Sequence, residues 1–119
     1  MINLLSVFIG GGIGSIFRWL CSSLISSHWG TMFVNVSGAF LIGAAYSYFA
    51  KMSTLSQEFK LFVMTGLLGG FTTFSTYLLN FTTLANDNRL TEAFLYLIGS
   101  VLTGCIFLFA GMKIVDNFI

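Results

Sequence analysis

The chain contains no proline, little charge and almost none of the side chains that build metal centres or hydrolase sites. Its 119 residues include one histidine, two cysteines and 8% charged residues. Cys21 and Cys105 lie in or at the end of apolar segments and form no CxxC pair, so we expect them to pack as small apolar residues. We therefore predict no zinc site and no thiol or Ser/His enzyme. The formal net charge of +1 offers neither a basic face for nucleic acid nor an acidic tail.

Apolar residues make up 56% of the chain. This share is too high for a soluble domain of this length, and it predicts an integral membrane protein. We therefore expect one all-α transmembrane domain over residues 1–119. Residues 1–12 contain no Lys or Arg, so the first apolar run is expected to be a retained helix rather than a signal peptide. Since a membrane-spanning helix needs about 20 mostly apolar residues, four spans are predicted, at residues 2–23, 31–50, 59–83 and 91–115.

The third run contains a stretch that a plain lipid-facing helix would not use, residues 69–77 (GGFTTFSTY). Because the chain has no proline, a kink must come from glycine or from a polar side chain that enters the helical hydrogen-bond ladder. Gly69-Gly70 and Thr72-Thr73 provide both. Free backbone groups are tolerated at membrane depth only where protein buries them or where they line a wet cavity. The stretch therefore predicts a broken third helix at an ion site or a pore, with released carbonyls as cation ligands.

Each predicted helix also carries polar side chains on one face. The first contains Arg18, and the second contains Asn35 as the only amide deep in its span. Four helices with one polar stripe each predict a shared polar path. The stripes of the third and fourth helices are Thr73, Thr76, Tyr77, Asn80 and Thr83, and then Tyr96, Ser100 and Thr103.

Each of these side chains also has a plainer interpretation, which the sequence leaves open. Arg18 can extend to the membrane surface, and Asn35 can form an ordinary hydrogen bond between helices. A serine or threonine can bond back to a carbonyl of its own helix. Phe74 and Tyr77, on neighbouring turns, can simply pack, or they can offer the positive edge of an aromatic ring to an anion.

The basic residues are divided almost evenly between the two sides of the membrane. With four spans, Lys51, Lys60 and Lys113 fall on one side, and Arg18 and Arg89 fall on the other. Membrane orientation follows the excess of Lys and Arg on one side, and this three-to-two split provides little excess. We therefore expect insertion in both orientations and head-to-tail pairing about a two-fold axis in the membrane plane.

These features together resemble the Fluc (CrcB) fluoride channels of bacteria, along essentially the whole sequence. The resemblance is carried by Gly14 with Arg18-Trp19, by residues 30–35 (GTMFVN) with Gly38 and Gly43, and above all by residues 69–77. It implies a passive channel, without enzyme activity, that exports fluoride through the bacterial plasma (inner) membrane. It also implies an antiparallel, dual-topology homodimer with two pores, each built from both subunits, and a structural sodium ion on the two-fold axis.

The resemblance also implies roles for particular residues. Gly69 and Thr72 match the residues whose backbone carbonyls hold the sodium ion, and Arg18 matches the vestibule arginine. Tyr77 departs from the family pattern, where phenylalanine is usual, and Gly104 stands where a second serine of the fourth helix is expected. The residues expected to line the fluoride pore are Asn35, Phe74, Thr76, Tyr77, Tyr96, Ser100 and Thr103, the last offering a hydroxyl from the helical face beside Gly104.

Two other functions and one other assembly remain open at this point. A small multidrug transporter needs a carboxylate within the membrane. An accessory membrane subunit would explain the glycines, but it would leave Asn35, the broken helix and the polar stripes unexplained. Some relatives pair as paralogues, and the presence of all main pore positions in one chain favours a homodimer. The carboxylates fall at segment ends or in loops, which disfavours the transporter: Glu58, Asp87, Glu92 and Asp116.

Overall fold

The computed structural model describes residues 1–119 and is entirely helical. Four helices are long and apolar enough to cross a membrane, which confirms the predicted all-α class with four spans. The second span begins at His28 rather than residue 31, because the Ser27 side chain caps it by accepting a hydrogen bond from the Trp29 N–H at 3.3 Å. The spans extend over Ile2–Leu24, His28–Lys51, Gln57–Asn86 and Leu90–Phe118.

The third span is broken where the glycine and threonine motif predicts it. Residues 72–74 lie outside any helix, so the predicted break is confirmed. The π-helical geometry of η1, with its wider i→i+5 turns, was not predicted from the sequence. The span consists of α3 (Gln57–Lys60), η1 (Leu61–Leu68), α4 (Gly69–Phe71) and α5 (Ser75–Asn86).

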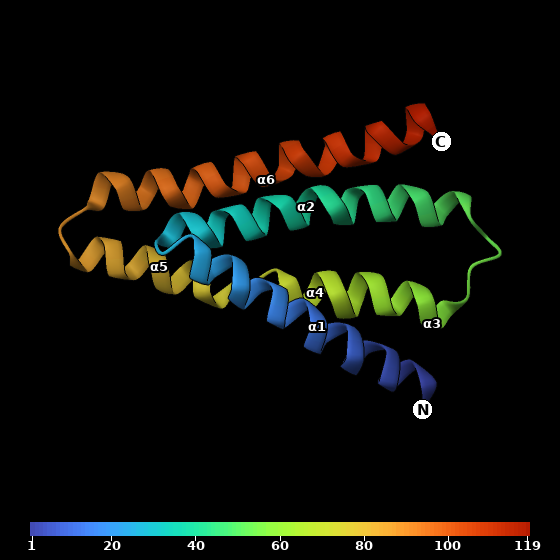
Figure 1. Ribbon diagram of the computed structural model, residues 1–119. Helices are drawn as coiled ribbons and strands as arrows, with labels where there is room; N and C mark the ends of the chain where they lie inside the picture. Colours follow the sequence, from blue (N-terminus) through green and yellow to red (C-terminus); the bar gives the residue numbers. More distant parts are fainter.

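The helices pack into a flat bundle with extents of 52 × 34 × 20 Å. α6 (Leu90–Phe118) runs along α2 (His28–Lys51), while α1 (Ile2–Leu24) crosses η1 and α4 (Figure 1). α5 lies beside the first part of α6, so the two halves of the third span have different neighbours. Both termini and the connection between α2 and α3 lie at one end of the bundle, and the other two connections lie at the opposite end (Figure 1).

Glycines allow α1 to approach η1 at backbone distance. A Cβ atom added at Gly10 would lie 2.5 Å from the Phe62 carbonyl oxygen, and one at Gly14 would overlap the Leu67 carbonyl oxygen. Gly12 of the same helix has open space around it. Small residues at a helix contact let two backbones meet closely in a membrane, so Gly10 and Gly14 permit the close packing of α1 on η1.

The largest buried apolar cluster lies where α5 meets α6. It contains Tyr77, Leu84, Ala93 and Tyr96, and the last two are fully buried. Many other large apolar side chains are exposed along the outside of the bundle. Extensive exposed apolar surface marks contact with lipid or with another protein chain.

Candidate functional site

Asn35 holds the break in the third span from the neighbouring helix α2. Its Nδ2 donates to the Thr73 carbonyl at 2.8 Å, and the Thr73 N–H donates to its Oδ1 at 2.8 Å. The amide thus replaces the helical partners that Thr73 lacks, and the interhelical hydrogen bond considered for Asn35 is confirmed. An asparagine amide has two N–H donors, and Thr73 occupies one of them.

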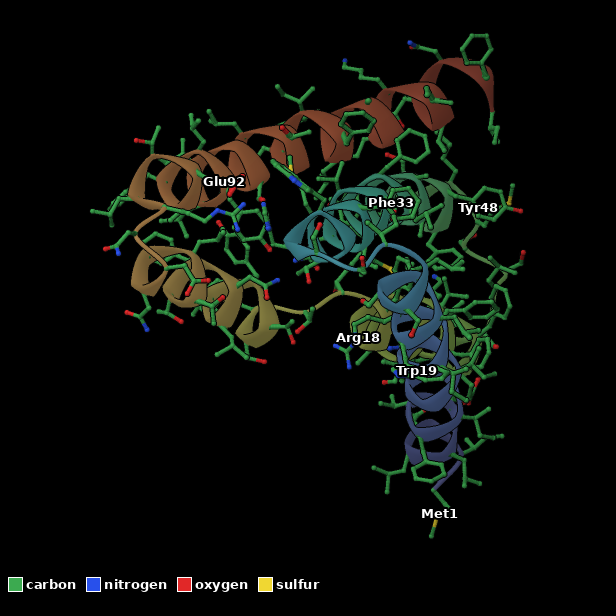
Figure 2. All side chains as sticks on the ribbon, turned by 60° about the vertical axis from the view of Figure 1, so that its left-hand side comes forward. Met1, Arg18, Trp19, Phe33, Tyr48 and Glu92 are labelled. Atoms are coloured by element: carbon green, nitrogen blue, oxygen red, sulfur yellow. The ribbon has the colours of Figure 1, made fainter.

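The break also changes the bonding of two backbone carbonyls, those of Gly69 and Thr72. In an unbroken helix the Thr73 N–H would donate to the Gly69 carbonyl, but here it donates to Asn35. The Thr72 carbonyl accepts a long hydrogen bond from Arg18 Nη1 at 3.4 Å. Figure 2 shows Arg18 beside the connection between α4 and α5. Unwound carbonyls can bind sodium in membrane proteins, so the carbonyls of Gly69 and Thr72 are the groups in this chain that could hold such an ion.

A cavity of about 410 Å³ lies between α2, the break and α6. Its lining includes four of the predicted pore residues, namely Asn35, Phe74, Tyr77 and Ser100. Gly104 also lines it. The structure therefore brings side chains from three spans to one space.

Ser100 contributes a free hydroxyl to this cavity. Its side chain is 8% exposed, and its Oγ has no hydrogen-bond partner. Other hydroxyls bond back to their own helix, such as that of Ser37, which donates to the Phe33 carbonyl at 2.7 Å. A buried polar atom without a partner calls for an unobserved water, ion or ligand. Ser100 is therefore available to donate to a molecule or ion in the cavity.

The two aromatic residues after the break have different environments. Phe74 is 71% exposed, whereas Tyr77 is 5% exposed, and their ring centroids are 6.0 Å apart. The Tyr77 hydroxyl donates to the Leu97 carbonyl on α6. The extra hydroxyl that distinguishes Tyr77 from phenylalanine therefore has a partner within the chain.

Tyr96 belongs to a polar network that joins three spans. Asn80 Nδ2 donates to Thr31 Oγ1 at 2.9 Å and to the Tyr96 hydroxyl at 3.2 Å. Asn80 connects α5 to α2 and α6 in this way. It was not among the predicted pore residues, although an amide on the polar stripe of a span was the signal that could have singled it out.

Three predicted pore residues lie outside the cavity, namely Tyr96, Thr76 and Thr103. Thr76 is exposed on α5, and its backbone N–H donates to Thr73 Oγ1 at 3.3 Å. Thr103 is half-buried and does not line the cavity, whereas its neighbour Gly104 does. Pore roles for these three residues, like those of the four that line the cavity, stay predictions.

The family of the chain follows from comparison with known proteins. A family model described as "CrcB-like protein, Camphor Resistance (CrcB)" matches residues 5–112. The chain belongs to the CrcB family. A CrcB relative from Nitrobacter hamburgensis, "Fluoride-specific ion channel FluC 2", is 40% identical over 97% of this chain and 98% of its own length.

Other CrcB relatives cover nearly the whole chain as well. The "Fluoride-specific ion channel FluC" of Rhodopseudomonas palustris is 39% identical over 93% of this chain and 94% of its own length. The protein of the same name from Agrobacterium fabrum is 38% identical over 98% of each chain. These CrcB proteins are named as ion channels, so the family is one of channels and not of enzymes, as the sequence predicts.

Proposed function

We propose that the chain is a passive, fluoride-selective channel that exports cytoplasmic fluoride. The main observation in support is the cavity beside the helix break. There, Ser100 has a buried hydroxyl without a hydrogen-bond partner, and Asn35 has one N–H that forms no hydrogen bond. Fluoride is small and strongly hydrated, so a path must replace its water with donors yet bind weakly enough at each site to release it. The Ser100 hydroxyl and the Asn35 N–H have no acceptor in the chain, so they can replace water molecules around the ion.

The proposed path is lined by the polar and aromatic residues of the cavity. Asn35 and Ser100 donate to the dehydrated ion, while the positive ring edges of Phe74 and Tyr77 bridge the apolar middle. Arg18 adds a positive charge near the break and raises the local concentration of anions. Tyr96, Thr76 and Thr103 extend the polar path toward its ends, and larger halides are excluded by its narrowness.

The proposed assembly is an antiparallel, dual-topology homodimer with two pores in the bacterial plasma membrane. Phe74 is 71% exposed in the single chain although it lines the cavity, as expected if a second copy completes the pore wall. The even distribution of basic residues favours both orientations. On the two-fold axis, the carbonyls of Gly69 and Thr72 would hold a structural sodium ion, whose charge would hold the two breaks together.

The positions of the carboxylates favour a channel over a proton-coupled transporter. Glu92 pairs with Arg89 at the start of α6, and an Asp116 carboxylate oxygen lies 3.9 Å from Lys51 Nζ at the opposite end of the bundle. Neither lines the cavity. Proton exchange for cationic drugs needs an acidic side chain within the path.

The test is fluoride release from liposomes that contain only the purified protein, followed with a fluoride electrode. We expect rapid fluoride release, and no chloride release from matched chloride-loaded liposomes. Equal release of both halides would contradict the selectivity. If protein that elutes as a folded dimer releases no fluoride, the proposed channel function is wrong. The accessory-subunit alternative would then be favoured.

A further inference from the structure

The proposed path makes no use of the only histidine, His28, although this side chain lies beside it. The imidazole ring meets the Tyr96 ring edge-on, with centroids 4.9 Å apart and an interplanar angle of 84°. The Tyr96 ring lies 5.4 Å from that of Tyr77, which lines the cavity. His28 thus stands at the end of the bundle where α2 and α6 begin, two aromatic rings away from the cavity.

Charged and unpartnered polar atoms surround this ring. His28 Nε2 is buried without a hydrogen bond. Glu92 forms an ion pair with Arg89, which precedes α6, and Figure 2 places Glu92 in the first turns of that helix. Buried polar atoms without partners mark places where water or an ion belongs. The free Nε2 of His28 therefore marks this end of the bundle, called the mouth below, as a place where water or an ion can bind.

We propose that His28 is a further anion-handling residue at this mouth, where protonation of its imidazole increases the fluoride current. The proposal rests on the proposed function. The charged groups that act on the ring are Glu92 and Arg89, and the phenol groups of Tyr96 and Tyr77 are neutral at physiological pH.

The charge of this mouth depends on pH through one group. Arg89 and Glu92 cancel each other, so the mouth cluster of His28, Arg89 and Glu92 has no net charge while the imidazole is neutral. Histidine is the side chain whose charge most readily changes in the physiological pH range. Acidification therefore changes the net charge of the cluster from zero to one positive charge.

The size of the effect depends on how closely the anion approaches the imidazole. A single positive charge about 7 Å from an anion in a wet vestibule raises the local anion concentration roughly three-fold. Because fluoride enters cells as the neutral acid, the proposed response increases conduction under the acidic conditions that load the cell with fluoride.

The experiment measures fluoride current through the purified protein in planar lipid bilayers, with equal solutions on both sides. Because hydrogen fluoride carries no charge, its leakage through the lipid does not contribute to the measured current. We expect a rise of roughly three-fold between about pH 8 and about pH 5. We expect no rise in His28→Gln, whose side chain is polar but does not titrate. A flat wild-type response, or the same rise in His28→Gln, would overturn the proposal.

A second measurement follows His28 without using activity. Trp29 lies 4.5 Å from the imidazole ring, and protonated imidazole quenches indole fluorescence. In a Trp19→Phe background, Trp29 is the only tryptophan. Its emission should fall with acidification, at the same midpoint as the current rises, and a midpoint that differs from that of the current would contradict the proposal. Absence of fluoride current at every pH, with the fluorescence titration intact, would instead contradict the proposed channel function.

Discussion

The two halves of the third span pack in opposite ways. The first half, η1 and α4, lies against α1 through glycines, so that backbone meets backbone. The second half, α5, lies against α6 and α2 through aromatic rings and the side-chain hydrogen bonds of Tyr77 and Asn80. The break at residues 72–74 separates the two. Close backbone packing fixes the position of the span, whereas the polar contacts set the chemistry of the space beside it.

This difference predicts which changes each half tolerates. At Gly66 and Gly70 in the first half, a larger side chain has no room, whatever its polarity. In the second half and at the break, size matters less than the number of hydrogen-bond donors and acceptors that remain. Substitutions in the two regions should therefore separate loss of folding from loss of conduction.

The largest effect is expected for Gly14→Leu in the contact with η1. The added Cβ would overlap the Leu67 carbonyl oxygen, so the helices must separate and stability should fall by about 1–3 kcal/mol or more. The measurement is the yield of monodisperse protein and its thermal unfolding temperature. Gly12→Leu on the same helix is the matched control, because nothing lies within 4 Å of a Cβ at that position. Equal losses in both variants would refute the close-contact explanation.

Asn35→Asp should strongly reduce conduction, and it keeps only one of the two hydrogen bonds that hold the break. The carboxylate still accepts a hydrogen bond from the Thr73 N–H, but it no longer donates, and its negative charge repels fluoride. Fluoride release should fall at least roughly ten-fold. The assay is liposome efflux, with dimer elution as the control for folding. Release at the wild-type rate would remove Asn35 from the path.

Ser100→Ala should reduce conduction without reducing stability. The Ser100 hydroxyl has no partner in the folded chain, so its removal breaks no hydrogen bond. We expect fluoride release to fall by roughly five- to ten-fold, because one donor to the ion is lost. The unfolding temperature should be unchanged or slightly higher. A drop in unfolding temperature would show instead that Ser100 has a structural partner.

The smallest effect is expected for Tyr77→Phe. The ring stays, and only the hydrogen bond to the Leu97 carbonyl is lost, so the free energy of unfolding should fall by about 1 kcal/mol. Fluoride release should fall far less than in Ser100→Ala. Denaturation of the two variants in the same detergent provides the comparison. A larger loss of conduction in Tyr77→Phe would place the hydroxyl itself in the ion path.

The sequence predicted those parts of the fold that depend on local composition. Long apolar runs identified the four spans, and the glycine and threonine motif identified the break. The partner of Asn35 depends on how two helices meet, so the polarity of Asn35 was visible but its bond to Thr73 was not. The π-helical turns of η1 and the network around Asn80 likewise arise from packing between spans. His28 gave no signal because a lone histidine beside a turn is ordinary until its neighbours are known.

The bonds between Asn35 and Thr73 also set an order of events in the assembly of the protein. Residues 72–74 lack helical partners of their own, and a side chain of another helix satisfies the backbone of Thr73. An isolated third span in lipid would gain those bonds by continuing as a regular helix. The interruption is therefore expected to arise after membrane insertion, when α2 and the third span meet, so that the proposed ion path is a product of tertiary folding rather than of the inserted segments themselves.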